Sequence, residues 1–347
     1  TRIADLLAQM PAKDAKLLKS NMQDIANLGE DGYVQLISGL TAPGKANNSL
    51  IEYTVGGFSA YATQTGQESL RKMSVNAYCK VLQQLTDPQN KAFIISQFDL
   101  VGKDDAVNCL GAYLNDNVLA DPAARALAKI NTSTSKAVLL NGLGKASGQA
   151  RLSIIEALGD VRYPQAAQAI QSILANADAR TTKIALYSLA YIADPASENV
   201  LATAAEKAGY KYENTNAVSS YLIYANEILR KGDKALAAKM AQNVWDKTNT
   251  GELTDVHTAA LKLLVQAVSD NQSMLLTAGT DPNSQYRRAA LKFAIPYVNA
   301  GNTSAWIKAM NKANDETKAD IIYMLGQVPA PEALNAIVKQ YKQQNPN

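Results

Sequence analysis

The sequence predicts an all-α protein, a right-handed solenoid of about ten stacked helix pairs. First, a short pattern of apolar and turn residues recurs about every 31 residues along most of the chain. Second, apolar residues between these recurrences have the spacing of amphipathic helices, and the alternation that is typical of strands is absent. Because such hairpins bury their apolar faces only against neighbouring hairpins, they form a stack with a long exposed face.

The recurring pattern, which we call the triad, is an apolar residue, a second one three positions later, and a turn or capping residue after three more. Two copies, Leu158/Val161/Pro164 and Leu189/Ile192/Pro195, differ by a constant shift of 31 residues (189 − 158). The other clear copies are Phe98/Val101/Asp104, Leu127/Ile130/Ser133, Leu264/Ala267/Asp270, Ile295/Val298/Gly301 and Leu325/Val328/Pro331, and Ile25/Leu28/Asp31 and Phe58/Tyr61/Gln64 are weaker. We expect the apolar members to lie inside the stack.

Each repeat is predicted to contain two helices. Around the triad at Leu158, the segments QARLSIIEALGDV and PQAAQAIQSILAN both place apolar residues at helical spacing, and a short turn separates them. Asp-Pro pairs at 87–88, 121–122, 194–195 and 281–282 are predicted helix starts. There an aspartate can cap the helix and a proline can occupy its first turn without losing a hydrogen bond.

We expect one solenoid over residues 1–347, with segments that differ in regularity. The predicted segments are divergent repeats over 1–86, regular repeats over 87–205, a longer irregular unit over 206–255, regular repeats over 256–341, and a polar linker over 342–347.

Three segments, EALGDVRYPQAAQAI, LAYIADPASENVL and MLGQVPAPEALNAIV, resemble the short HEAT-like repeat of the bilin-lyase type. In that repeat the first helix ends in Ala-Leu-Gly, and a brief turn, often Asp-Pro, leads to the second helix. The resemblance implies an armadillo-like α-α superhelix. Tetratricopeptide repeats are the nearest alternative, but their proline closes the second helix, whereas here it opens that helix.

The whole chain also resembles the helical-repeat region of secreted bacterial proteins that carry a downstream domain related to keto-disaccharide hydrolases and concanavalin-like glycosidases. This resemblance implies an extracytoplasmic protein, periplasmic or on the cell surface. The chain begins at Thr1, so either a signal peptide was removed or the chain was trimmed. Its function would be non-catalytic binding or scaffolding, towards a protein partner or an adjoining domain. The alternative is an accessory region of a glycan-processing hydrolase whose catalytic domain lies outside this chain.

The composition argues against several other classes. The net charge is only +3, and the basic residues are scattered in isolated pairs such as Arg287-Arg288. A nucleic-acid partner, as in the HEAT-like DNA glycosylases, is therefore not expected. No apolar run approaches the length of a transmembrane helix, about 18 residues.

Enzyme chemistry is not expected from this chain. Its one histidine, His257, follows Glu252 and Asp255 in GELTDVHTAALKLL, where acidic residues are expected simply because a helix begins there. With one histidine and two cysteines, neither a metal site nor a catalytic triad is predicted. The segment NGLGKASGQA lacks the spacing of a phosphate-binding loop. We therefore predict no catalytic residue and no cofactor.

Cys79 and Cys109 lie 30 residues apart, which would make them neighbours in the stack. The favoured interpretation is two small buried residues, and a single disulfide is the alternative.

Aromatic residues are the candidates for a binding surface. Trp245 and Trp306, on predicted second helices, are expected to be exposed on the concave side. Tyr187, Tyr191, Tyr221 and Tyr224 lie at helical spacing on neighbouring first helices. They either fill a wide gap between repeats or form an aromatic ledge for a peptide or a sugar.

Overall fold

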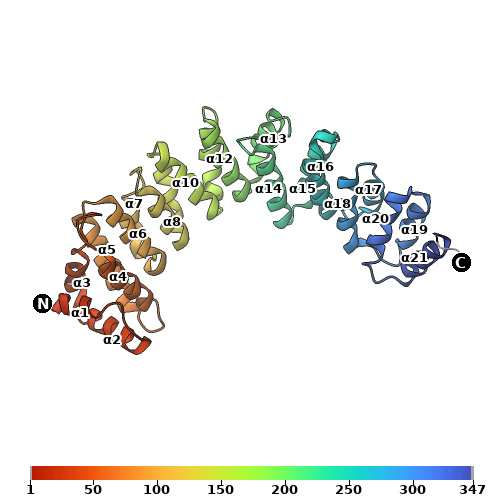
Figure 1. The fold of residues 1–347 in the computed structure, drawn as a ribbon. Helices are drawn as coiled ribbons and strands as arrows, with labels where there is room; N and C mark the ends of the chain where they lie inside the picture. The colour runs from red at the N-terminus through yellow and green to blue at the C-terminus, as the bar shows by residue number, and fades with distance from the viewer. Residues whose placement is uncertain (1, 345–347) are drawn as a thin grey trace. The chain divides into compact units, whose positions relative to one another are not determined.

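The computed structural model describes residues 2–344, and every regular element in that range is a helix (Figure 1). The chain divides into two compact units, residues 1–188 and 189–347, and the division falls within α12 (Ala179–Ile192). Within each unit consecutive helices pack as antiparallel pairs and the pairs stack on one another. The predicted all-α solenoid class is confirmed, whereas the boundaries of its predicted segments stay a prediction.

In unit 1 the first helices of the hairpins form one layer, in which α2, α4, α6, α8 and α10 contact one another in that order. In the second layer α3 packs on α5 and α7 packs on α9. The helices are α1 (Arg2–Ala8), α2 (Ala15–Ala26), α3 (Gly29–Ile37), α4 (Ser49–Ala62), α5 (Glu68–Gln84), α6 (Pro88–Val101), η1 (Asp104–Ala106), α7 (Val107–Gly111), α8 (Ala120–Ile130), α9 (Ser133–Leu143), α10 (Gly148–Asp160), η2 (Pro164–Ala166) and α11 (Ala167–Leu174).

Unit 2 has the same organisation. The first layer contains α14, α16, α18 and α20 in contact, and α17, α19 and α21 stack in the second layer. The helices are η3 (Pro195–Ser197), α13 (Glu198–Lys207), α14 (Ala217–Arg230), α15 (Lys234–Lys247), η4 (Gly251–Leu253), α16 (Thr254–Ala267), α17 (Gln272–Ala278), α18 (Ser284–Ala294), η5 (Ile295–Tyr297), α19 (Thr303–Lys312), α20 (Asp315–Leu325) and α21 (Pro331–Gln344).

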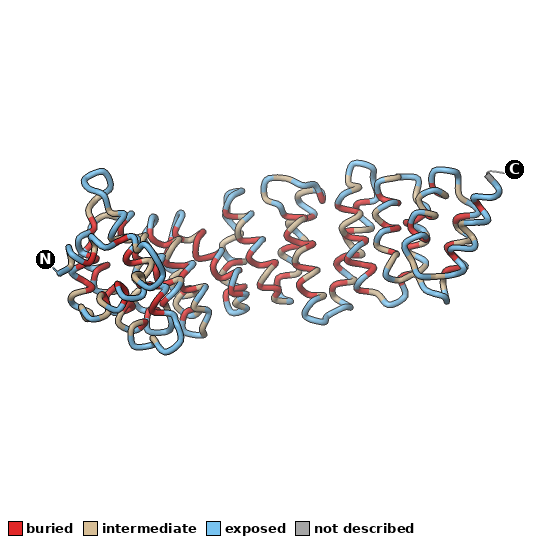
Figure 2. The backbone as a smooth tube through the Cα atoms, turned by 60° about the horizontal axis from the view of Figure 1, so that its bottom comes forward, coloured by how far each residue is buried: buried red, intermediate tan, exposed pale blue. Residues whose placement is uncertain are grey.

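Most triads mark the inside of their hairpin, as predicted, although the apolar members Leu28, Ile130, Ile295, Val298 and Val328 are only partly buried. Leu158 and Leu189 are fully buried, and Pro164 and Pro195 begin the 3₁₀ turns that open the second helices. The residue after the second apolar position is left-handed in three consecutive repeats, with φ of 53° at Asn131, 52° at Arg162 and 51° at Ala193. The same backbone turn therefore recurs with the sequence repeat. Buried residues run along the faces where helices of one unit meet (Figure 2).

The Asp-Pro pairs lie at helix starts, although only two of them act as predicted. Asp87 accepts a hydrogen bond from the backbone N–H of Asn90 at 2.9 Å, and Asp194 accepts one from that of Ala196 at 2.8 Å. Asp121 lies inside the first turn of α8, and Asn283 rather than Asp281 caps α18.

Buried rings build the core of the first repeats in unit 1. The Tyr33 ring lies 4.7 Å from that of Phe58 and 5.9 Å from that of Tyr78, which in turn contacts Phe98 at 5.8 Å. The Tyr33 and Tyr78 hydroxyls share a hydrogen bond of 2.8 Å, so the buried polar atoms are paired. Burial raises the pKa of Tyr78 to about 12, which keeps this pair neutral.

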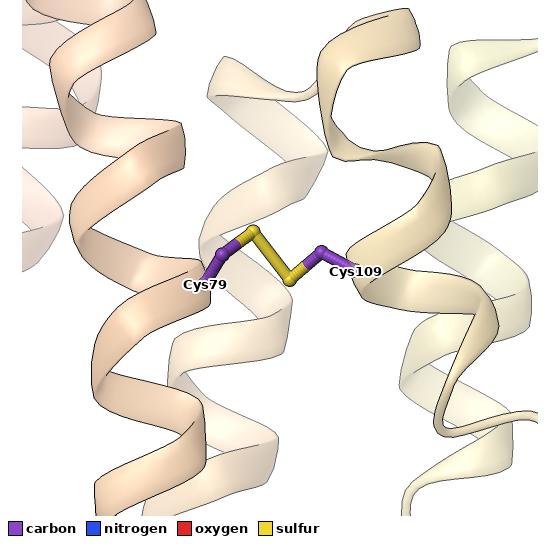
Figure 3. The surroundings of a disulfide bond; sticks show 2 residues. All are labelled: Cys79 and Cys109. Carbon is purple, nitrogen blue, oxygen red and sulfur yellow. A yellow bond between two sulfur atoms is a disulfide. The ribbon is translucent and has the colours of Figure 1, made fainter.

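Cys79 of α5 and Cys109 of α7 form a disulfide (Figure 3). Their Cα atoms are 5.9 Å apart, within the usual disulfide range. The favoured interpretation of two small buried residues is therefore wrong, and both cysteines are only half-buried. Second helices of adjacent repeats place equivalent positions side by side, and the spacing of 30 residues brings the two sulfurs together.

Among residues 2–344, none of the helices combines the length and the apolar character that crossing a membrane requires.

Candidate functional site

The exposed face of the first layer is formed by residues two positions before and two after the first triad residue, which we call the flanking pairs. Members of a pair are four residues apart, so they lie on one side of a helix. Most are exposed in both units, while the first triad residue between them is buried. The pairs around the clear triads, apart from the half-buried Phe293/Tyr297 around Ile295, are Ser96/Leu100 on α6, Arg125/Lys129 on α8, Glu156/Asp160 on α10, Tyr187/Tyr191 on α12, Lys262/Gln266 on α16, and Tyr323 on α20 with Gln327 just after its end.

In unit 1 the flanking pairs on α8 and α10 are charged, whereas the pair Ser96/Leu100 on α6 is not. Arg125 pairs with Asp121 at 2.8 Å on α8, and the next helix carries Glu156 and Asp160. Partial desolvation between helices raises the pKa of Glu156, with smaller contributions from the nearby carboxylates of Asp121 and Asp160. Desolvation also raises the pKa of Asp160. These carboxylates therefore lie in a partly enclosed part of the face.

In unit 2 the first layer forms a groove between α18 and α20 with a volume of about 580 Å³. Its floor includes the buried side chains of Leu291 and Met324. Tyr323 is 75% exposed at its edge, an unusual exposure for a large aromatic side chain. The lining residues are Arg288, Leu291, Lys292, Ile295, Asp320, Tyr323, Met324 and Gln327.

A buried ion-pair network supports one wall of this groove. The guanidinium of Arg287 is almost fully buried and donates to Asp320 Oδ2 at 2.7 Å and to Glu316 Oε1 at 3.0 Å. The exposed Arg288 donates from Nε to the other Asp320 oxygen at 3.0 Å. Among the lining residues Arg288 and Lys292 are positively charged and Asp320 is negatively charged, so the lining has a net positive charge.

The two tryptophans occupy the predicted second helices, but they are not both exposed. Trp306 on α19 is 1% exposed, so its predicted exposure is wrong. It packs in the core of unit 2 beside Leu291, where a Cβ on Gly279 would lie only 2.9 Å from Cζ3 of the indole. The absence of a side chain at Gly279 makes room for the ring. Trp245 on α15 is half-buried, and its Nε1 donates to the Tyr286 hydroxyl at 2.9 Å.

The four tyrosines separate into two groups. Tyr221 and Tyr224 are buried in α14, and the Tyr224 hydroxyl donates to the Asp194 carbonyl at 2.7 Å. They fill space between repeats, so they do not form a ledge with the other pair. Tyr187 is 46% exposed and Tyr191 half-buried, both on the exposed side of α12. Whether these two contact a ligand stays a prediction.

The residues around the only histidine do not converge on a metal. Asp255 accepts a hydrogen bond from Gln285 at 2.6 Å, Glu252 lies 3.8 Å from Lys211, and His257 is buried in an aromatic stack. Among the residues described, no three His, Cys, Asp or Glu side chains are grouped to hold a metal ion.

No protein-family model matches this chain. No curated protein matches it. The chain is similar to a solved structure described as "A conserved phosphorylation switch controls the interaction between cadherin and beta-catenin in vitro and in vivo", with 12% sequence identity and a TM-score of 0.36. The match covers 99% of this chain and 89% of that chain. A similarity at this level supports no conclusion about function, and the fold class rests on the packing described above.

The residues that form the groove were not predicted from the sequence. Tyr323 and Gln327 are a flanking pair, so the repeat pattern itself carries the signal that would have identified them. The predicted binding surface was chosen by residue type, as tryptophans and tyrosines, rather than by position relative to the triad.

Proposed function

We propose that this chain is a non-catalytic binding module that holds a segment of a protein partner in the groove between α18 and α20. The observation that carries the proposal is the exposed ring of Tyr323 above the apolar floor of Leu291 and Met324. An exposed aromatic side chain beside an apolar depression is typical of protein interfaces, where tyrosine and arginine contribute most of the binding energy.

The chemistry of the groove favours a peptide with both apolar and polar groups. Leu291, Ile295 and Met324 can accept an aliphatic or aromatic side chain. Gln327 and the cations at the rim can bond to peptide carbonyls or carboxylates. The volume of about 580 Å³ is large enough for a few side chains of an extended segment.

The proposal also includes the type of repeat and the cellular location of the protein. We infer HEAT-type repeats from the Ala-Leu-Gly and Asp-Pro pattern, which the stacked hairpins support. We infer an extracytoplasmic location in a secreted bacterial protein. The disulfide between α5 and α7 supports it, because disulfides persist mainly in oxidising compartments. The alternative of an accessory region beside a glycan hydrolase stays a prediction.

The groove can be tested with a random peptide library displayed on phage and selected on the purified chain. We expect the selected peptides to lose binding to the Tyr323→Ser variant and to keep binding to the Tyr341→Ser variant. Tyr341 is a suitable control because it is also highly exposed in unit 2 but lies on α21, away from the groove. Equal binding to Tyr323→Ser and the parent chain would contradict the proposed site.

A further inference from the structure

A separate cavity lies in unit 2 at the junction of α15, α16 and the start of α18, next to η4. Its volume is about 260 Å³, which is suited to one small chemical group rather than a chain segment. It lies outside the α18/α20 groove, because the two share none of their lining residues. The lining residues are Asn249, Thr250, Gly251, Thr254, His257, Asp281, Pro282, Asn283 and Tyr286.

Two aromatic rings, those of His257 and Tyr286, line this cavity, and the Trp245 ring stacks on His257 behind the lining. The imidazole of His257 stacks on the indole of Trp245, with centroids 5.1 Å apart, and lies 4.7 Å from the Tyr286 ring. The Trp245 Nε1 donates to the Tyr286 hydroxyl, which ties the two outer rings together. His257 and Tyr286 are both nearly buried, so this side of the cavity is rigid and largely dry.

The imidazole is neutral and its tautomer is determined by its neighbour. Thr248 Oγ1 donates to the Val244 carbonyl at 2.7 Å, so it accepts a hydrogen bond from His257 Nδ1 at 3.1 Å. Burial lowers the pKa of His257 below its usual value. The burial of His257 therefore favours its neutral form, so the aromatic side does not favour an anion.

The lining also contains the carboxylate of Asp281, and none of the described lysines or arginines lines the cavity. Asp281 uses Oδ1 to accept a hydrogen bond from the Asn283 backbone N–H at 2.8 Å. The negative charges of Asp281 and Asp246 both raise the pKa of His257, which indicates a negative electrostatic potential at the imidazole. Arg287 approaches the Asp281 backbone carbonyl at 3.0 Å, but Asp320 and Glu316 balance its charge.

We propose that this cavity binds an organic cation, a guanidinium or ammonium group, with Asp281 as its counter-ion. The Asp281 carboxylate can accept two N–H groups of a guanidinium, and Asn249 and Thr250 offer further oxygen acceptors at the rim. The neighbouring rings keep water from the pair and strengthen the electrostatic attraction. Anions are disfavoured, because Asp281 would repel them and no cation in the lining would offset the repulsion.

The cation could come from a free amine or from an arginine or lysine of a protein segment. Both sources supply the same group, and the test below distinguishes them. The inference does not depend on the α18/α20 groove. Cation binding should be unchanged in Tyr323→Ser, so either proposal can fail alone.

Fluorescence of Trp245 provides the measurement, because this indole stacks directly on a lining residue whereas the only other tryptophan, Trp306, is buried in the core away from the cavity lining. The chain is titrated with N-acetyl-arginine amide and, as a neutral analogue of the same shape, N-acetyl-citrulline amide. We expect a saturable change with the arginine compound only. The affinity of the Asp281→Asn variant for the arginine compound should fall about tenfold, because the asparagine can still accept the hydrogen bond of the turn but carries no negative charge.

Asp270→Asn is the matched control, an exposed carboxylate in the same unit that does not line the cavity. It should bind like the parent chain. A citrulline compound that binds as tightly as arginine, or an Asp281→Asn variant with unchanged affinity, would overturn the proposal. A Gly-Gly-Arg-Gly-Gly peptide distinguishes the source. Tighter binding of the peptide than of the amide assigns the cation to a protein segment, and equal binding assigns it to a free small-molecule cation, because the flanking chain then adds no contact.

Discussion

The indole of Trp245 lies nearly parallel to the imidazole of His257, with ring centroids 5.1 Å apart and an interplanar angle of 16°. The imidazole is thereby removed from solvent, and its Nδ1 is paired with Thr248. Protonation would place a positive charge in this buried stack, which is why burial lowers the pKa of His257.

The stability of the chain should therefore fall as the pH drops below 6.5, the usual pKa of histidine. The unfolded chain takes up a proton on His257 before the folded chain does, so the loss begins near that value and continues down to the folded-state pKa. The measurement is the thermal midpoint of unfolding between about pH 7.5 and pH 5.5. His257→Phe should be less stable throughout but should lack this pH dependence. Parallel curves for the two proteins would contradict the prediction.

Removing the buried arginine of unit 2 should be far more harmful than removing its exposed neighbour. Arg287→Met leaves Asp320 and Glu316 without their buried partner and should lower the free energy of unfolding by about 3–5 kcal/mol. Arg288→Met also loses a contact with Asp320, but at an exposed site, where the cost should be below about 1 kcal/mol. Chemical denaturation of both variants checks the difference, and similar losses would contradict it.

The disulfide should stabilise unit 1 and make it sensitive to reductant. It closes a loop of 30 residues, for which the expected stabilisation is about 2–4 kcal/mol. Adding dithiothreitol should therefore lower the thermal midpoint of the parent chain. A Cys79→Ser/Cys109→Ser variant should melt at the lower temperature with or without reductant. If thiol titration of the denatured, unreduced chain detected two free thiols, the disulfide assignment would be wrong.

Replacing either of two helical glycines of unit 1 with alanine should change the stability, but in opposite directions. At Gly159 in α10 a Cβ would lie 2.8 Å from the Ser188 Cα, so Gly159→Ala must push two helices apart and should cost about 1–3 kcal/mol. At Gly56 in α4 a Cβ would meet no atom within 4 Å, so Gly56→Ala should stabilise by about 0.5–1 kcal/mol. Urea unfolding of the two variants measures both changes, and destabilisation by Gly56→Ala would refute the second.

Much of the fold could be predicted because helices and hairpin turns depend on local sequence. The triad leucines are buried where the pattern placed them, and Pro164 and Pro195 open second helices. The binding surface could not be predicted from aromatic residues alone. Trp306 and Tyr221 are aromatic and yet buried, whereas Tyr323 is exposed on a flanking pair.

Local sequence was enough to predict the all-α class, the repeat and the inward face of most helices, because a spacing of about 3.6 residues per turn translates directly into sides of a helix. The contacts between repeats became known only from the three-dimensional packing. Examples are the Cys79–Cys109 disulfide, the partners of Arg287 and the ring stack on His257. Most of these contacts join residues about 30 apart, the Trp245–His257 stack joins two different helices, and others depend on a neighbour's shape, as when the missing Cβ of Gly279 admits Trp306. Local periodicity contains no information about how closely two helices approach or which side chain fills the space between them.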